Sequence, residues 1–489
     1  MTTIIKNTLS SKNILILMLV ACFIFLFGLR AQITESFPIS PFFYNFIQAR
    51  HLIFLLLFPS FFLILQDIKN KNYKFLRYIT MLGSFIIAHS IINIFFDKSI
   101  ITYSTFLGIV LLLMLFTVAY YYNEIINDNL NSIINIFFLF FFTSTILSFF
   151  NYKSDAPFFC GGIPDFIGLN TENIIPYRLP DVRLSFKEFI FLENSHLGMI
   201  APGVLAFSFF KIIDIKSNNY FKFFTIIFFI ICILKSSTTL LIGILISFSV
   251  IIFFNFKVLS KKLITTYSLI ILGTIIILAT NTECTSRINI DKLNFFKVVG
   301  KYNETKIKKF FGYDKENRLV YIEKIAPILL YIDEGPKNDN PNISNDYVNK
   351  KFVKTKGNLS SQIYNHSFEI LRVSIFDRPF GWGLNRYDKA YRHYNKIVSI
   401  ESRSYVTGMN TKDGANNLVK ILVEFGVFGL CFYFLVLLFM INRFIPLEHK
   451  LFYGSLIITQ SIRAAGYYNG GFALIAFLMI FSYIKTVKK

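Results

Sequence analysis

Arginine is concentrated in one short stretch of a chain that is otherwise rich in lysine. The sequence holds 36 Lys and 14 Arg, and five of the arginines lie within 32 residues: Arg372, Arg378, Arg386, Arg392 and Arg403. A guanidinium binds phosphate or carboxylate oxygens through two parallel hydrogen bonds, whereas the lysine ammonium is a point charge. This stretch therefore predicts a site for an anionic ligand. The alternatives are ion pairs with nearby carboxylates such as Asp377 and Asp388, or contact with lipid headgroups.

Two titratable side chains stand at the start of an apolar stretch, about 192–213. Glu193 and His196 are spaced i and i+3, which places them on one face of a helix. Polar groups at the end of an apolar helix are costly and often functional. Either residue is therefore a candidate general base that accepts a proton from a hydroxyl group. The alternative is a hydrogen-bonded pair with a structural role.

The one tryptophan of the chain lies in a predicted turn, Gly381-Trp382-Gly383. Asn385 is expected to cap a helix that runs to about Ile397. Three tyrosines of that helix share one face: Tyr387, Tyr391 and Tyr394. Aromatic rings suit sugar faces and apolar lipid equally, and we expect these tyrosines to pack in the core.

Further polar residues stand at two other helix ends. Asn416 and Asn417 precede an apolar stretch, about 417–442, where they either orient substrate hydroxyls or cap the helix. Glu424 is expected to have a structural role, complementing the N-terminus of that same helix. Arg463, near the end of another apolar stretch, either contacts a diphosphate or extends to lipid headgroups.

The composition is that of a membrane protein. Hydrophobic residues make up 54% of the 489 residues and charged residues only 16%, against about 25% in soluble domains. The mean hydropathy is +0.54, and the net charge is +21. These values exclude an ordinary soluble enzyme, a disordered chain and a secreted disulfide scaffold. They predict an all-α polytopic membrane protein.

Twelve stretches are apolar enough to cross a bilayer, which takes roughly 20 residues of helix. They are about 14–29, 49–66, 76–96, 101–121, 131–150, 192–213, 220–235, 238–256, 263–280, 417–442, 450–466 and 470–486. The seventh and eighth are separated by 235–237 alone, and form either a tight hairpin or one long interrupted helix. The first stretch lacks a small-residue cleavage site and is interpreted as a span rather than a signal peptide.

The positive-inside rule orients these spans. With the N-terminus in the cytoplasm, the inner segments carry seventeen basic residues and the short outer loops carry five. Both termini are then cytoplasmic. The chain divides into a membrane domain of nine spans at 1–280 with an outer loop at 151–191, a large outer loop at 281–416, and three spans at 417–489. Because the basic loop faces away from the cytoplasm, nucleic acid is not an expected partner.

The large loop is too long to be only a connector, so we expect it to fold over the membrane domain. Its apolar stretches Val320–Ile332 and Ile363–Phe376 are expected to be helical. Cys160 and Cys284 both fall outside the membrane and are candidates for a disulfide. The five cysteines show no CxxC or Cys/His cluster, so no metal site is predicted.

Three motifs together resemble the O-antigen polymerase/ligase superfamily of bacterial inner membranes. The strongest is Asn416-Asn417-Leu418 followed by Leu422-Val423-Glu424-Phe425-Gly426-Val427-Phe428-Gly429, which is similar to the family's His-Asn-Leu … Leu-x-Glu-x-Gly-x-x-Gly. The second is Arg378-Pro379-Phe380-Gly381-Trp382-Gly383, similar to its Pro-x-Gly-x-Gly turn. The third is Phe191-Leu192-Glu193-Asn194-Ser195-His196-Leu197-Gly198, preceded by Arg183. The resemblance covers roughly 180–445.

The resemblance implies a GT-C-like glycosyltransferase that joins undecaprenyl-diphosphate-linked repeat units at the periplasmic face, with lipid diphosphate as the leaving group and no cofactor. It implies a lipid-linked glycan donor and acceptor as partners, and a chain-length regulator as a further one. The expected catalytic residues are Arg183, Glu193, His196 and Arg372. The expected substrate-binding residues are Arg378, Trp382, Arg386, Asn416, Asn417 and Arg463.

Two other functions are compatible with the sequence. An O-antigen ligase transfers finished polymer to lipid A-core, and the family's ligases have histidine where this chain has Asn416, which favours the polymerase. Arg372 and Gly383 also match an Arg-x10-Gly pattern of polymerase loops. A polysaccharide or lipid-linked oligosaccharide transporter fits the hydropathy, but such proteins commonly show repeated halves, and no half-repeat is visible here.

Overall fold

The protein is helical throughout most of the chain that the computed structural model describes. The described residues are 53–97, 103–150, 194–215, 218–235, 238–279, 359–394, 411, 414–463, 466–468 and 471–487, with four short strands between 302 and 355. The helices of the first part are α5 (Ile53–Lys69), α6 (Lys74–Asp97), α7 (Tyr103–Asp128), α8 (Leu130–Phe150), α9 (Asn194–Ile213), α10 (Asn219–Lys235), α11 (Thr238–Asn255) and α12 (Lys261–Ala279).

The second part holds the remaining helices and the strands. The helices are α15 (Leu359–Asp377), α16 (Tyr387–Tyr394), α18 (Asn417–Phe425), α19 (Val427–Ile441), α20 (Leu447–His449), the π-helix η5 (Lys450–Gly454), α21 (Ser455–Ile462) and α22 (Phe472–Val487). The strands form two antiparallel pairs, β1 (Tyr302–Asn303) with β4 (Lys354–Thr355) and β2 (Phe311–Tyr313) with β3 (Leu319–Tyr321).

The predicted apolar stretches from the second to the ninth each form one helix. Helices α5 to α12 begin within four residues of the predicted starts. Helix α10 ends at Lys235 and α11 begins at Thr238, and each packs against α9, so the seventh and eighth stretches are two separate helices. The first stretch, about 14–29, lies outside the described residues.

Two of the described helices are long and apolar enough to cross a membrane, over Lys74–Asn93 and Thr105–Asp128. Shorter apolar helices accompany them, among them Leu197–Ile213, Thr239–Asn255 and Phe472–Thr486. Many large apolar side chains on the described helices are exposed; Phe58 on α5 is 72% exposed and Met81 on α6 is 68% exposed. Exposed apolar faces of this kind indicate contact with a membrane or a partner.

The prediction that the tenth stretch forms a single helix is wrong. It is broken at Gly426, where φ is 53°, and forms α18 and α19. The N–H of Val427 donates to the carbonyl of Pro379, at 2.8 Å, instead of continuing the helix. A segment distant in the sequence therefore lies across the break. The eleventh stretch begins as the π-helix η5 and continues as α21, and the twelfth is α22.

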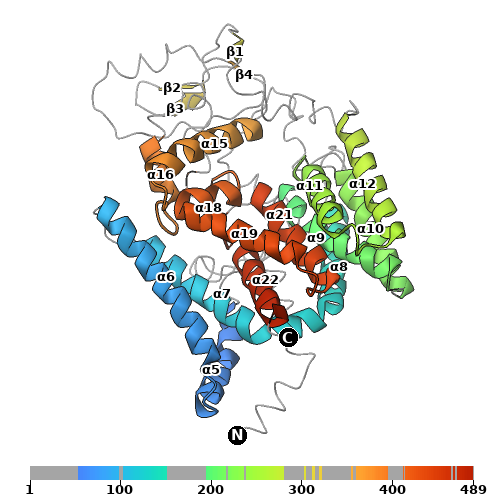
Figure 1. The fold of residues 1–489 in the computed structure, drawn as a ribbon. Coiled ribbons are helices and arrows are strands. Elements are labelled where there is room, and N and C mark those ends of the chain that lie inside the picture. The colour runs from blue at the N-terminus through green and yellow to red at the C-terminus, as the bar shows by residue number, and fades with distance from the viewer. Residues whose placement is uncertain are drawn as a thin grey trace.

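The large loop is helical where its last part is described. The predicted helix at Ile363–Phe376 is confirmed as α15. Of the predicted helix at Val320–Ile332, the structure describes only the first two residues, and these belong to strand β3 rather than to a helix. Helices α15 and α16 lie over α18 at one end of the bundle, while α22 packs on α7 and α21 on α9 (Figure 1).

Candidate functional site

Helices α15 and α16 both pack on α18 (Figure 1). Four of the clustered arginines belong to α15, to α16 or to the segment between them: Arg372, Arg378, Arg386 and Arg392. Arg403 lies outside the described residues. We refer to the segment Arg378–Arg386, which joins α15 to α16, as the 378–386 turn. Its backbone crosses the last residues of α18: the N–H of Trp382 donates to the carbonyl of Val423, at 3.0 Å, and that of Gly383 to Glu424, at 2.8 Å. Because α18 ends at Phe425, these carbonyls have no helical partner, and the turn supplies one.

Two glycines allow this crossing. Gly381 has φ of 83°, and a Cβ there would lie 2.3 Å from the carbonyl oxygen of Glu424. A Cβ on Gly426 would lie 1.9 Å from the carbonyl oxygen of Pro379. Both glycines also occupy the left-handed region of φ, which glycine adopts at little cost. The turn and the helix break are therefore two parts of one close contact.

The carboxylate of Glu424 is fully buried and holds three segments together. It accepts hydrogen bonds from the backbone N–H groups of Asn385 (2.9 Å) and Tyr387 (3.1 Å) and from the hydroxyl of Tyr467 (2.7 Å). It also forms an ion pair with Lys420, at 3.3 Å. Glu424 thus has the structural role expected from the sequence, but it complements the N-terminus of α16 rather than that of its own helix.

The guanidinium of Arg378 lies on the face of Trp382, with its Cζ 3.6 Å from the ring centroid. Its Nη1 is buried and has no hydrogen-bond partner. Among the ion pairs of the described residues none involves Arg378, so the expected alternative, a pair with Asp377, is not what the structure has. A buried cationic N–H without an acceptor favours an anionic ligand.

Trp382 is fixed from behind by a chain of hydrogen bonds. Its indole Nε1 donates to the hydroxyl of Tyr394, at 3.3 Å, and that hydroxyl donates to Oδ2 of Asp377, at 2.5 Å. Burial, followed by the neighbouring carboxylate of Asp377, raises the pKa of Tyr394 to about 12. The hydroxyl therefore stays protonated at physiological pH and remains a donor to Asp377.

Replacing Tyr394 with phenylalanine is expected to loosen Trp382, because the buried indole N–H then loses its acceptor. The expected loss is about 1–3 kcal/mol of folding free energy. Since Trp382 is the one tryptophan, its emission reports this site alone. We expect a red-shifted emission and a lower midpoint of thermal unfolding. The control is Tyr220→Phe, at a side chain that is 76% exposed on α10, which should change neither.

The other predicted arginines differ in exposure. Arg372 is exposed on α15, and no described residue pairs with it. Arg386, the last residue of the 378–386 turn, is buried. Arg463 follows α21, with its Cζ 5.8 Å from the ring of Tyr364 on α15. The hydroxyl of Tyr364 donates to the carbonyl of Ile462, at 2.6 Å, so Arg463 is held against the helix that carries Arg372.

The two asparagines that begin α18 have different roles. Asn416 caps the helix, because its Oδ1 accepts from the N–H of Val419 at 2.7 Å. Asn417 is completely buried, yet neither its Oδ1 nor its Nδ2 has a hydrogen-bond partner. An unsatisfied buried amide is costly. Asn417 therefore keeps both a donor and an acceptor for a ligand.

Several predicted residues cannot be placed with this cluster. Arg183, Glu193, Cys160 and Cys284 lie outside the described residues, and His196 is in the first turn of α9 with its side chain outside them. The described part of the chain holds no group of three or more His, Cys, Asp or Glu side chains that could bind a metal ion.

Sequence reasoning missed His89, which joins α6 to the site. Its ring stacks between Phe85 and Phe425, and its Nε2 lies 2.8 Å from the carbonyl oxygen of Phe380. Asn93, one turn further along α6, lies beside Gly383. Both residues are polar side chains inside the apolar stretch 76–96. Such side chains are costly unless they have a role, and this signal could have identified them from the sequence.

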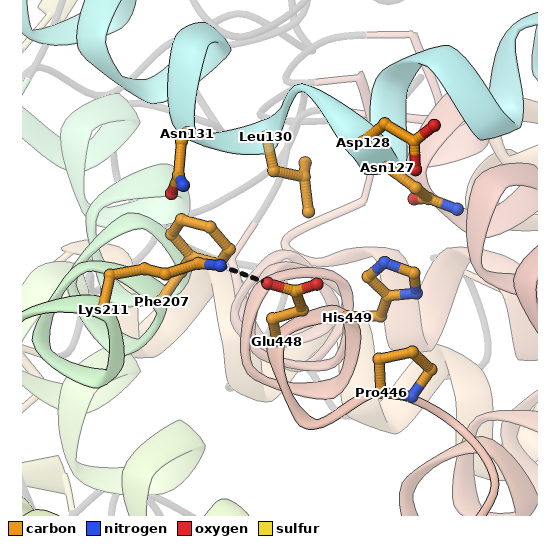
Figure 2. Close-up of a pocket in the computed structure, with 9 residues that line it drawn as sticks. All are labelled: Asn127, Asp128, Leu130, Asn131, Phe207, Lys211, Pro446, Glu448 and His449. Carbon is orange, nitrogen blue, oxygen red and sulfur yellow. Dashed lines mark hydrogen bonds and ion pairs between the residues drawn. The ribbon is translucent and has the colours of Figure 1, made fainter. Parts of the chain in front are cut away.

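A separate polar pocket of about 370 Å³ lies at the far end of α7 (Figure 2). Helix α7 reaches the site near Gly108, whose carbonyl accepts from Tyr468, and reaches the pocket at Asp128, roughly 30 Å along the helix. An ion pair between Lys211 and Glu448 crosses the pocket. Burial lowers the pKa of His449, which lines it. None of the predicted site residues that the structure describes lines this pocket.

Comparison of the chain with protein-family models, with curated proteins and with solved structures gave no match. The functional argument therefore depends on the residues and their geometry.

Proposed function

We propose that this protein is a membrane glycosyltransferase that polymerises undecaprenyl-diphosphate-linked oligosaccharide repeat units. The proposed setting is the bacterial inner membrane, crossed about twelve times in a GT-C-like architecture. Both termini are cytoplasmic, and the site faces the periplasm. The single observation that carries the proposal is the guanidinium of Arg378, held on Trp382 with a buried N–H that has no acceptor.

The geometry suits a diphosphate leaving group. Transfer breaks the bond between the anomeric carbon and the diphosphate oxygen, and negative charge develops on that oxygen. Preorganised cationic donors stabilise such charge in the transition state without reorganising. Arg378 is fixed on Trp382, Arg372 is exposed on α15, and Arg463 lies against Tyr364 of α15. No described carboxylate forms an ion pair with any of the three.

The site also has groups for a glycan. Asn417 offers an unused amide donor and acceptor at the start of α18, which is the pairing that a sugar hydroxyl satisfies. The exposed apolar faces of α5 and α6 fit an enzyme whose donor and acceptor both carry polyprenyl tails in the bilayer.

The polymerase is favoured over the ligase by Asn416. The family's ligases have histidine at this position, and in this chain the side-chain oxygen of Asn416 is used to cap α18. An asparagine amide is not a proton acceptor at physiological pH. The proposed reaction must therefore take its base from another residue.

A clean deletion in the source organism tests the proposal through the lipopolysaccharide gel profile. A polymerase predicts that core carrying a single repeat unit remains and that the ladder of longer chains disappears. Naked core, with polymer accumulating on the lipid carrier, would indicate the ligase. An unchanged profile would overturn the O-antigen assignment and point to another surface polysaccharide or to transport.

Replacing Arg378 with lysine in the complementing gene is expected to slow polymerisation by about 100-fold, because an ammonium provides neither the planar stack on Trp382 nor two parallel hydrogen bonds. The measurement is the rate of ladder formation after induction. The matched control is Arg443→Lys, at an exposed arginine after α19, which should leave the ladder unchanged. A wild-type ladder from Arg378→Lys would contradict the role given to the guanidinium.

A further inference from the structure

His393 is an exposed imidazole that lies against Trp382, the ring on which Arg378 stacks. It lies in the last turn of α16, whose buried face is formed by other residues: Tyr387, Ala390, Tyr391 and Tyr394. The ring of His393 lies 5.3 Å from that of Trp382 and 4.8 Å from that of Tyr394. No described residue forms a hydrogen bond or ion pair with it. The aromatic rings therefore fix one side of His393 and leave its nitrogens accessible.

Arg378 and this imidazole both lie against Trp382, which limits how far apart they can be. The guanidinium lies 3.6 Å from the indole centroid and the imidazole 5.3 Å from it, so the two groups are at most about 9 Å apart. In glycosidases that invert the sugar, the groups serving the nucleophile and the leaving group are separated by roughly 6.5–9.5 Å. The upper limit on the separation of Arg378 and His393 falls within this range, so both groups can reach one anomeric carbon and its two reacting oxygens.

The other described histidines are placed less well. His89 is buried in its aromatic stack on α6, and His366 is 2% exposed on α15 against Tyr391. His449 lines the pocket at the other end of α7. Histidine is the side chain that enzymes use most often as a general base. Among the described histidines, His393 is the exposed one beside the arginines.

We propose that His393 is the general base of this site, a proposal that rests on the proposed function. Its unprotonated nitrogen takes the proton of the acceptor hydroxyl as the hydroxyl oxygen bonds to the anomeric carbon of the donor. The bond from that carbon to the lipid diphosphate breaks, and its electron pair leaves with the diphosphate beside Arg378. The imidazolium then returns its proton to solvent. Glu193 and His196, the candidates that the sequence provides, are the competing bases.

The test uses the full-length protein in nanodiscs with a lipid-linked repeat unit as both donor and acceptor. His393→Gln and His393→Ala are expected to lower kcat by about 100- to 10,000-fold, with KM changed little. In the variants the fall of rate on the acid side of the wild-type pH profile should disappear, and added imidazole should partly restore His393→Ala. The control is His449→Gln, the same substitution at the other end of α7.

The outcomes separate this proposal from the proposed function. If the wild-type protein forms no polymer, the proposed function fails. If it forms polymer and the His393 variants keep wild-type rates, His393 is not the base while the function stands. If His196→Gln or Glu193→Gln abolishes the acid-side fall instead, the base is that residue. The emission of Trp382 shows whether each variant is folded. If the rate of the wild-type protein does not fall on the acid side of its pH profile, the proposal is overturned without any variant.

Discussion

Glu424→Gln is expected to destabilise the protein by about 3–5 kcal/mol, because it removes the carboxylate charge that forms an ion pair with the buried ammonium of Lys420. Both side chains are almost completely inaccessible, at 3% and 0% exposure. The substitution also weakens the acceptor for Asn385, Tyr387 and Tyr467, which come from two other segments. Thermal unfolding followed by the emission of Trp382 measures the loss.

A second substitution isolates the cause. Lys420→Met in the Glu424→Gln background removes the buried ammonium as well, so the double variant should recover part of the stability. The matched control is Glu124→Gln, which breaks the exposed pair between Lys485 and Glu124, at 3.0 Å. Breaking a surface pair should cost less than about 1 kcal/mol. Equal losses from Glu424→Gln and Glu124→Gln would contradict the burial of the Lys420–Glu424 pair.

Gly426→Ala is expected to have the other large effect, more than about 4 kcal/mol, and to prevent the 378–386 turn from docking on α18. The added Cβ would lie 1.9 Å from the carbonyl oxygen of Pro379 and 2.8 Å from the nitrogen of Gly381. These are backbone atoms, so the clash cannot be relieved by rotating a side chain. We expect little folded protein, with the Trp382 emission of a solvent-exposed indole.

Gly83→Ala is the matched control for this substitution. Gly83 lies within α6, and a Cβ there would meet no atom within 4 Å. Alanine should therefore be neutral or stabilise the helix by up to about 1 kcal/mol. Wild-type stability in Gly426→Ala would show that the turn does not cross the end of α18 at this distance.

The positions of the apolar helices could be predicted from the sequence, because apolar stretches of fixed length depend only on local composition. Helices α5 to α12 begin within four residues of the predicted starts. The break at Gly426 could not be predicted in this way. It depends on Pro379 and Gly381, which belong to a turn more than forty residues earlier in the chain. A hydropathy window contains no information about that contact.

The same limit applies to the site. The clustering of arginine was visible in the sequence. Capping was one of two roles that the sequence left open for Asn416, and the structure shows it. Two other features could not be predicted: the stacking of Arg378 on Trp382 and the four donors around Glu424. The donors around Glu424 come from segments that are distant in the sequence and meet only in the folded protein. Asn417 was predicted as a substrate-binding residue from its residue type and position. That its buried amide is unsatisfied could be recognised only from the packing of α18.

Product length measured by mass spectrometry tests the central claim most directly. Purified protein in nanodiscs would be given an undecaprenyl-diphosphate-linked repeat unit and no other substrate. The account predicts lipid-linked products of two or more units, with one undecaprenyl diphosphate released for each new linkage, and about 100-fold slower elongation by Arg378→Lys. Substrate that stays one unit long, or that is elongated only when lipid A-core is added, would contradict it.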